Sequence, residues 1–264
     1  MASPRSKSRP IWPSAAIEAE YRRRLLVLVQ AMNKSYSRWV CAAYRRDPPV
    51  MAQDVSPAAE LDRVMKHLGK YWQERFTDLA ADLAKYFAKS VHRRSDAALM
   101  AILKKGGIAI EFKMNAAMRD VFKATVEQNV DLIKSIPQQY HTQVTGLVMR
   151  SVQQGRDLHQ LTKDLRKRYG VTKERAVLIA SDQNNKATSA LMKARQTSLG
   201  IKRGIWMHSH AGKEPRPTHL ANDRKEFDIQ KGWFDPDKRV RAYIMPGQLI
   251  NCRCTWKPVI EALQ

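Results

Sequence analysis

Two pairs of potential metal ligands lie in the C-terminal quarter of the chain. One residue separates His208 from His210, and one residue separates Cys252 from Cys254. In an extended strand, residues i and i+2 project from the same face, so two neighbouring strands could bring two imidazoles and two thiolates together. Two sulfur and two nitrogen ligands suit tetrahedral zinc. The spacing therefore predicts a candidate structural zinc site, with His219 as a spare ligand.

A purely structural role for the cysteines is the alternative. Paired cysteines of structural zinc sites usually have two or more residues between them, and Cys-x-Cys is tighter than that. Cys252 and Cys254 could instead pack as small apolar residues, or flank Arg253 as it reaches a buried acceptor.

A catalytic metal is a further alternative. His-x-His with a third histidine could hold zinc and leave one position open. Three acids could then supply the general base: Glu214, Asp223 and Glu226. No spacing here matches a catalytic signature. We therefore expect no catalytic residues, no enzymatic activity and no cofactor other than the candidate zinc, and keep a zinc-dependent hydrolase as the alternative.

The elements that must position these residues are short. Residues 201–264 hold two of the three cysteines and three of the six tryptophans, in mixed segments bounded by turns. Such segments are typical of strands, which we expect around 203–208, 225–229 and 249–257.

The chain before residue 201 has helical periodicity. A first helix is predicted from Ser14 to the Asp47-Pro48-Pro49 break, and a second, capped by Ser56, begins at Pro57. Ser95 is predicted to cap a shorter helix that ends at Gly106-Gly107. The remaining helices are expected at about 112–134, 138–154, 158–170 and 172–200. The fold class is therefore α+β, a mostly helical N-terminal two-thirds with a small C-terminal α+β module of short strands.

The charge of the chain indicates a polyanionic partner. Lys and Arg number 47 against 25 Asp and Glu, a net charge of +22. Residues 1–124 hold 23 basic and 12 acidic side chains and residues 125–264 hold 24 and 13, so each half has a net charge of +11. An excess spread in this way suits contact with bulk DNA better than recognition of one short sequence.

Other classes are disfavoured. No apolar run approaches the roughly 18 residues that a membrane helix needs, so no membrane partner is expected. Three cysteines do not indicate a disulfide framework, and a reducing cytoplasm is the simplest compartment during synthesis. Residues 1–13 form a basic arm that we expect to be a frayed terminus, with a tether to DNA or a partner as the alternative.

Four motifs, in order, resemble those of the phage Mu F-like head-morphogenesis family. They are Asn129-Val-Asp-Leu-Ile-Lys-Ser-Ile-Pro137, Gly170-Val-Thr-Lys-Glu-Arg-Ala176 with Ile179–Lys186, Trp206–His219, and Pro246-Gly-Gln-Leu-Ile-Asn-Cys-Arg-Cys254. The resemblance covers roughly 125–258. It divides the chain into a helical region, 1–124, with the basic N-terminal arm, and a Mu F-like domain, 125–264. One departure is Ser181, where the family often has Arg.

The resemblance implies a late, non-enzymatic minor head protein of a tailed phage. The expected partners are the portal protein, the major capsid protein or scaffold, and viral double-stranded DNA, bound without sequence preference during head assembly, packaging or ejection. The expected location is the virion, in the capsid interior near the portal, after assembly in the host cytoplasm. Six polar residues of the motifs are expected to fix turns and core: Asp182, Gln183, Arg216, His219, Asn251 and Arg253.

Basic clusters are the candidates for DNA contact. They are Arg22, Arg23 and Arg24; Arg45 and Arg46; Arg93 and Arg94; Lys104 and Lys105; Arg166, Lys167 and Arg168; and Lys238, Arg239 and Arg241. A free DNA-binding regulator is a third hypothesis, but no helix-turn-helix or zinc-finger motif supports it.

Overall fold

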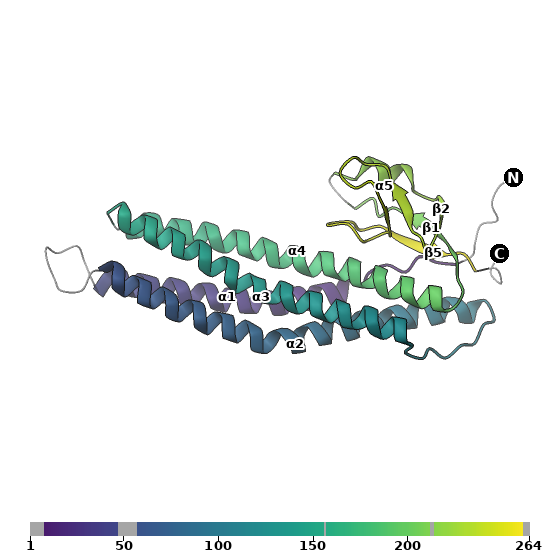
Figure 1. The fold of residues 1–264 in the computed structure, drawn as a ribbon, viewed down its shortest axis with the longest axis horizontal. Helices are drawn as coiled ribbons and strands as arrows, with labels where there is room; N and C mark the ends of the chain where they lie inside the picture. The colour runs from purple at the N-terminus through teal and green to yellow at the C-terminus, as the bar shows by residue number, and fades with distance from the viewer. Residues whose placement is uncertain (1–7, 47–56, 156, 212–213, 261–264) are drawn as a thin grey trace. The chain divides into compact units, whose positions relative to one another are not determined.

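The computed structural model describes residues 8–46, 57–155, 157–211 and 214–260. Four long helices come first (Figure 1): α1 Ala15–Arg46, α2 Pro57–Lys105, α3 Ala116–Gln153 and α4 Leu158–Ser198. The short elements follow: β1 Arg203–Met207, α5 Pro217–Ala221, β2 Glu226–Asp228, β3 Trp233–Asp235, β4 Ala242–Ile244 and β5 Thr255–Pro258. The predicted α+β class is confirmed. None of the described helices combines the length and apolar character needed to cross a bilayer.

The chain divides into two compact units, and each draws on segments from both sides of residue 125. The helical unit comprises Ala19–Ala84 and Glu127–Ala180. The sheet unit comprises Met1–Glu18, Lys85–Val126 and Ser181–Gln264. Each long helix therefore contributes to both units. The predicted boundary near residue 125 concerns sequence similarity and stays a prediction.

The helical unit buries the apolar stripe that the sequence predicts. On α1, Leu25, Val29, Met32 and Tyr36 are completely buried and recur every three or four residues, which places them on one face. Trp39, also on α1, is 46% exposed. It lies one position off the spacing that Tyr36 and Val40 follow.

Buried tyrosines of the helical unit keep their hydroxyl groups hydrogen-bonded. Tyr21 Oη donates to Asn129 Oδ1 over 2.9 Å, and Tyr140 Oη donates to Asn33 Oδ1 over 2.9 Å. Tyr36 Oη lies 3.0 Å from His141 Nδ1. These bonds join α1 to α3 and compensate the cost of burying three phenols.

Three predicted helix boundaries are wrong because packing overrides local sequence preference. Ser95 is buried inside the continuous helix α2, so it caps no new helix. Pro137 lies inside α3, and Gly170 lies inside α4. A helical glycine costs about 1 kcal/mol and a proline about 3 kcal/mol, amounts that the burial of a long apolar face can exceed.

Other predicted boundaries are confirmed, because there the glycine adopts a positive φ. Gly107 and Gly200 have φ of 76° and 75°. Ile108 N donates to Leu103 O over 3.0 Å, and Ile201 N donates to Gln196 O over 3.0 Å. These six-to-one bonds satisfy the last carbonyls of α2 and α4 and are typical of Schellman caps.

The strands form two small antiparallel sheets. One has the order β2-β1-β5, with Trp206 opposite Trp256, and the other pairs β3 with β4. The segments predicted around 203–208 and 225–229 correspond to β1 and β2. The segment 249–257 forms a strand only from Thr255. The prediction did not include β3 and β4.

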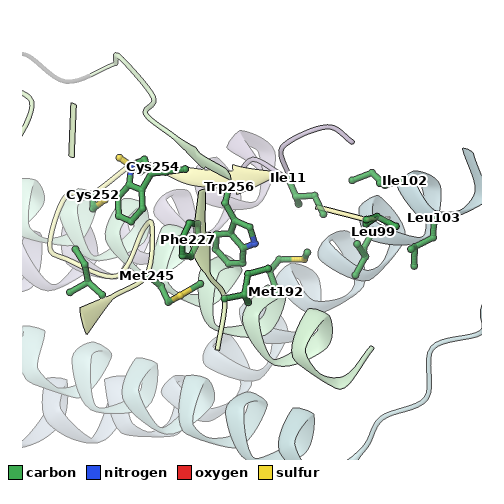
Figure 2. Packing of buried hydrophobic residues seen from close by; sticks show 14 residues of the cluster. Ile11, Leu99, Ile102, Leu103, Met192, Phe227, Met245, Cys252, Cys254 and Trp256 are labelled. Atoms are coloured by element: carbon green, nitrogen blue, oxygen red, sulfur yellow. The ribbon is translucent and has the colours of Figure 1, made fainter. Parts of the chain in front are cut away.

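The sheet unit has its own hydrophobic core (Figure 2). Trp206, Phe227 and Trp256 from the larger sheet pack in one cluster with Leu99 of α2 and Met192 of α4. Cys252 and Cys254 belong to the same cluster, and Figure 2 shows them at the end away from Leu99. The thiols are therefore part of a packed interior.

Residues 8–13 correct the expectation of a frayed terminus for the described part of the arm; residues 1–7 lie outside the described residues. Ile11 is buried in the core cluster. Ser8 Oγ donates to Pro258 O, and Thr255 Oγ1 donates to Ile11 O over 2.7 Å. This segment thus covers β5, because it offers an apolar side chain and hydrogen bonds to it.

Candidate functional site

One buried cluster of sulfur and nitrogen atoms stands out in the sheet unit. His219 Nδ1 lies 3.5 Å from Cys252 Sγ and 3.7 Å from Cys254 Sγ. Among the described residues, this is the one set of three His, Cys, Asp or Glu side chains whose ligand atoms all lie within 4.8 Å of one another. All three residues are buried and both thiols are free. The arrangement can hold a metal ion chemically.

Local structure explains how His219 reaches the thiols. Pro217 is the first residue of α5 and its ring presets the helical φ, which suits the start of so short a helix. Arg216, the residue before it, is extended and donates from Nη2 to Ile250 O over 2.9 Å. This bond fixes the start of α5 against the segment that carries the cysteines.

The cysteine segment is held by its own turn. Asn251 has φ of 58°, a left-handed conformation that Asn tolerates better than most residues. Its N–H donates to Asp182 Oδ1 over 3.0 Å. Gly247 N donates to Cys252 Sγ over 3.3 Å. The motif residues Arg216, Asp182 and Asn251 thus make contacts that suit the architectural role expected of them.

The remaining motif residues include Arg253, which contacts the backbone, and Gln183, which is buried. Arg253 Nη1 donates to Ala211 O over 3.1 Å, so its guanidinium reaches an exposed backbone acceptor. Gln183 is buried on α4. Ser181, at the position where the family often has Arg, lines a pocket of about 360 Å³ together with Glu18 and Arg253. The small side chain leaves room there that an arginine would occupy.

Asp235 orients the imidazole of His219. The carboxylate is completely buried, and its Oδ2 lies 3.2 Å from His219 Nε2. Because an ionised carboxylate only accepts hydrogen bonds, the proton of a neutral His219 belongs on Nε2. The lone pair of Nδ1 then points toward the two sulfur atoms. Sequence analysis missed Asp235, because the short strand β3 that carries it was not predicted.

The two thiols influence each other's ionisation. The hydrogen bond from Cys254 lowers the pKa of Cys252 against the opposing effect of burial. The same hydrogen bond, together with burial, raises the pKa of Cys254. A cation at this position would favour the ionisation of both thiols.

The histidine that lies beside the two cysteines is His219, and the prediction had placed His208 and His210 there. His208 and His210 follow β1, and His210 has φ of 51°, so the assumed strand alternation does not apply to the pair. His210 is exposed, with Nε2 3.4 Å from Asp223 Oδ2. His219, treated as a spare ligand, is the histidine in the cluster. The expected set of His208, His210, Cys252 and Cys254 is therefore corrected. The ligand atoms that lie together belong to His219, Cys252 and Cys254.

His208 lies beside the cluster without being part of it. Its Nδ1 accepts from His210 N over 3.1 Å. Burial lowers its pKa, and it interacts electrostatically with Cys252 and His219. His208 and the three cluster residues line one pocket of about 50 Å³. That volume can hold water or a fourth metal ligand and is far below the 300 Å³ or more of most small-molecule sites.

The three acids considered as catalytic bases differ in their hydrogen-bond and ion-pair partners. Asp223 Oδ1 accepts from His208 N over 2.8 Å, and Glu226 pairs with Arg203 over 2.8 Å. Glu214 is exposed and lines the small pocket. Two of the three acids therefore have other partners.

Comparison with known proteins finds a family model that is similar to part of this chain. Residues 142–257 match the model of the phage Mu protein F like proteins, and this range contains His219, Asp235 and both cysteines of the cluster. The chain carries the Mu F-like region. The predicted resemblance is confirmed over that range.

A relative extends the similarity beyond the Mu F-like region. An uncharacterized protein of Haemophilus influenzae (strain Rd) is 30% identical over an alignment of 264 positions that covers 97% of this chain. The chain spans 56% of that relative's length, so about half of it. No solved structure matches the chain.

Most of the predicted DNA-contact residues are exposed. In the helical unit, Arg23 and Arg24 pair with Glu20, whereas Arg45, Arg166 and Lys167 are exposed; Arg22 and Arg168 are half-buried. The side chain of Arg46 lies outside the described part of the structure. In the sheet unit, the exposed ones are Arg93, Arg94, Lys104, Lys105, Lys238, Arg239 and Arg241. No ligand contact tests their role.

The ribbon of β3 and β4 carries three of these exposed cations. Lys238, Arg239 and Arg241 lie in the turn that joins the two strands. Phe234 and Tyr243 are opposite each other in the ribbon, exposed, with ring centroids 5.4 Å apart. The Mu F-like region therefore presents flat rings next to a basic turn. Sequence analysis found the cations but not the aromatic pair, which appears only when the two strands are paired.

Proposed function

We propose that this chain is a non-enzymatic minor head protein that binds packaged double-stranded DNA without sequence preference. The family match supports a role in the phage head. The observation that carries the DNA role is the distribution of charge: each half of the chain has a net charge of +11, and exposed cations lie on both units. Cations that neutralise phosphates release counterions, a contribution to binding that is independent of base sequence.

The β3–β4 ribbon is the proposed main DNA contact. Lys238, Arg239 and Arg241 supply three exposed charges on one turn, and Lys231 Nζ lies 4.6 Å from the ring centre of Tyr243. A two-stranded ribbon can approach a DNA groove while its basic residues contact the backbone. Exposed rings are less favourable next to water than in contact with sugars and base edges.

The proposed partners in the particle are the portal protein and the major capsid protein or scaffold. The proposed location is the capsid interior near the portal, reached after synthesis in the host cytoplasm. Both follow from the family and from the charge, because a strongly basic chain suits the compartment that holds DNA. Co-sedimentation of the purified chain with portal rings and with empty procapsids would test the docking, and binding to neither would contradict it.

Hydrolysis is not the function that the geometry supports best. Cys252, His219 and Asp235 have the order of a nucleophile, a base and an orienting acid. However, both cysteines are at most 4% exposed and the adjoining pocket is about 50 Å³. A peptide or a sugar could not reach the sulfur without opening the core.

Titration of unrelated duplex DNAs at several salt concentrations tests the DNA role. We expect equal affinity for all duplexes and a log affinity that falls steeply with log salt. The variant K238A/R239A/R241A should bind more weakly and lower the magnitude of the salt slope by about 2 to 3, close to 0.9 per lost phosphate contact.

A charge-matched variant provides the control. R63A/K66A/R203A removes the same three charges, but each of these residues already pairs with a carboxylate, Glu60, Asp62 or Glu226. It should retain most of the affinity. Salt-insensitive binding by the unmodified chain, or an equal loss in both variants, would contradict the proposed DNA contact.

A further inference from the structure

The distances in the buried cluster match those of a tetrahedral zinc site. With Zn–S of about 2.3 Å and Zn–N of about 2.0–2.1 Å, tetrahedral angles place sulfur and nitrogen about 3.6 Å apart. The observed separations from His219 Nδ1 are 3.5 Å to Cys252 Sγ and 3.7 Å to Cys254 Sγ. The side chains are therefore already spaced for a metal.

We propose that Cys252, Cys254 and His219 bind a structural Zn²⁺ ion. Thiolate and imidazole are the ligands that zinc prefers in closed protein sites. The residues come from α5 and from the segment before β5, which are more than 30 residues apart along the chain. The metal thus joins two segments of the sheet unit that have little regular structure of their own.

The surroundings of His219 supply a second, independent reason. Asp235 Oδ2 lies 3.2 Å from Nε2, on the side of the ring opposite the sulfur atoms. A metal-bound histidine almost always donates its other N–H to a carboxylate or a carbonyl, which fixes the ring and increases its basicity. A completely buried carboxylate is costly, and a cation held through His219 would offset part of that cost.

The closed character of the site follows from burial. Trp206 packs against His219 with ring centroids 5.2 Å apart, and both thiols belong to the hydrophobic cluster. The remaining coordination position faces the pocket that His208 lines. A buried ion with this environment stabilises a fold and has no route for a large substrate.

The site also supports the basic turn of the ribbon. Asp235 Oδ1 accepts from Asp237 N over 3.0 Å, and Asp237 Oδ1 accepts from Arg239 N over 2.8 Å. The metal would therefore hold, through His219 and Asp235, the backbone that presents Lys238, Arg239 and Arg241. This zinc proposal does not depend on whether those residues bind DNA.

Metal analysis of the full chain, purified under reducing conditions, tests the proposal. We expect one zinc per chain, and Co²⁺ in its place should give intense visible bands of tetrahedral geometry with thiolate-to-metal charge transfer. C252S and C254S should lose the metal and the bands. C41S is the matched control, because Cys41 is on α1 in the helical unit and should leave both unchanged.

A second measurement covers the case in which the cysteine variants do not fold. A strong chelator added to the unmodified chain should lower the thermal midpoint by at least about 5 °C, and added zinc should restore it, because a ligand that binds only the folded state stabilises it. Three results would overturn the proposal: no bound zinc and no Co²⁺ spectrum in the reduced chain, unchanged metal in both C252S and C254S, or a disulfide between the two cysteines in the folded protein.

Discussion

Asp235 and His219 form a completely buried pair in which Oδ2 of the carboxylate lies 3.2 Å from Nε2 of the imidazole. The other oxygen of Asp235 accepts from the backbone of Asp237. One carboxylate therefore connects the sulfur–nitrogen cluster to the start of the basic turn. Its loss should affect metal affinity and the turn together.

Replacing this carboxylate tests the connection. D235N keeps the volume but cannot accept as strongly from Nε2–H, so we expect zinc affinity to fall about 10- to 100-fold, as is usual for such partners of a ligating histidine. Competition with a chromophoric chelator measures the affinity. D228N is the control, because Asp228 bonds the N–H of Lys231, away from the cluster. Equal affinity in D235N and the unmodified chain would show that Asp235 does not support the site.

The two neighbouring histidines should differ in their effect on the metal. His208 lines the pocket beside the cluster, whereas the His210 side chain is 62% exposed and faces Asp223. We expect H208A to retain zinc but to change the Co²⁺ spectrum and weaken affinity at least about tenfold, a loss typical of a ligand or its close support. H210A should match the unmodified chain. The reverse result would assign the fourth position to His210.

A buried ion pair should dominate the stability of the sheet unit. Arg195 donates from Nε and Nη2 to the two oxygens of Asp96, over 3.0 and 2.6 Å, and from Nη1 to Lys113 O. D96A leaves the buried Arg195 guanidinium without its carboxylate and should cost about 3 to 5 kcal/mol. R195A should cost less, because Asp96 is half-buried and keeps His92 Nδ1 at 3.6 Å. Urea unfolding gives the free energy.

An exposed ion pair of the same unit provides the control for the free energy of unfolding. E226A breaks the bridge from Arg203, whose side chain is 50% exposed, and should cost at most about 1 kcal/mol. A double-mutant cycle on Arg195 and Asp96 should give a coupling of more than 1 kcal/mol. If D96A cost no more than E226A, the buried pair would not stabilise the fold.

Two helical glycines should respond to alanine in opposite directions. A Cβ at Gly69 would lie 2.6 Å from the His141 ring, whose Nδ1 bonds Tyr36. Overpacking typically costs about 1–3 kcal/mol, more than the gain of about 1 kcal/mol in helix propensity, so G69A should destabilise. At Gly146 the nearest atom is 3.6 Å away, and G146A should stabilise by up to about 1 kcal/mol. Thermal or urea unfolding separates the two, and stabilisation by G69A would show that the ring moves freely.

Periodicity predicted the helices well where burial decides the pattern. The buried residues from Leu25 to Val40 recur every three or four positions on one face of α1, as the helical periodicity of the sequence predicts. Single residues that often mark helix ends predicted the boundaries less reliably. Ser95 and Gly170 resemble boundaries in the sequence, yet both lie inside helices because the apolar face continues on either side of them.

Of the candidate site, the sequence could predict the two cysteines but not their partners, because those partners depend on the tertiary structure. Cys252 and Cys254 are close in sequence, so their proximity needs no fold. The partner histidine depends on where α5 lies, and a choice between His208, His210 and His219 requires the tertiary structure. Asp235 is 16 residues beyond His219, on a three-residue strand with no periodic pattern, and only the folded chain reveals its contact.

The contact of residues 8–11 with β5 constrains the order in which the molecule can form. Ser8 bonds Pro258 and Ile11 bonds Thr255 across 250 and 244 residues of sequence. Closing so long a loop is entropically costly and slows folding. On the ribosome, residues 8–11 must wait for β5, which is made about 250 residues later. The sheet unit can therefore reach its final hydrogen bonding only after synthesis passes residue 258, whereas no such delay applies to the helical unit, which ends at Ala180.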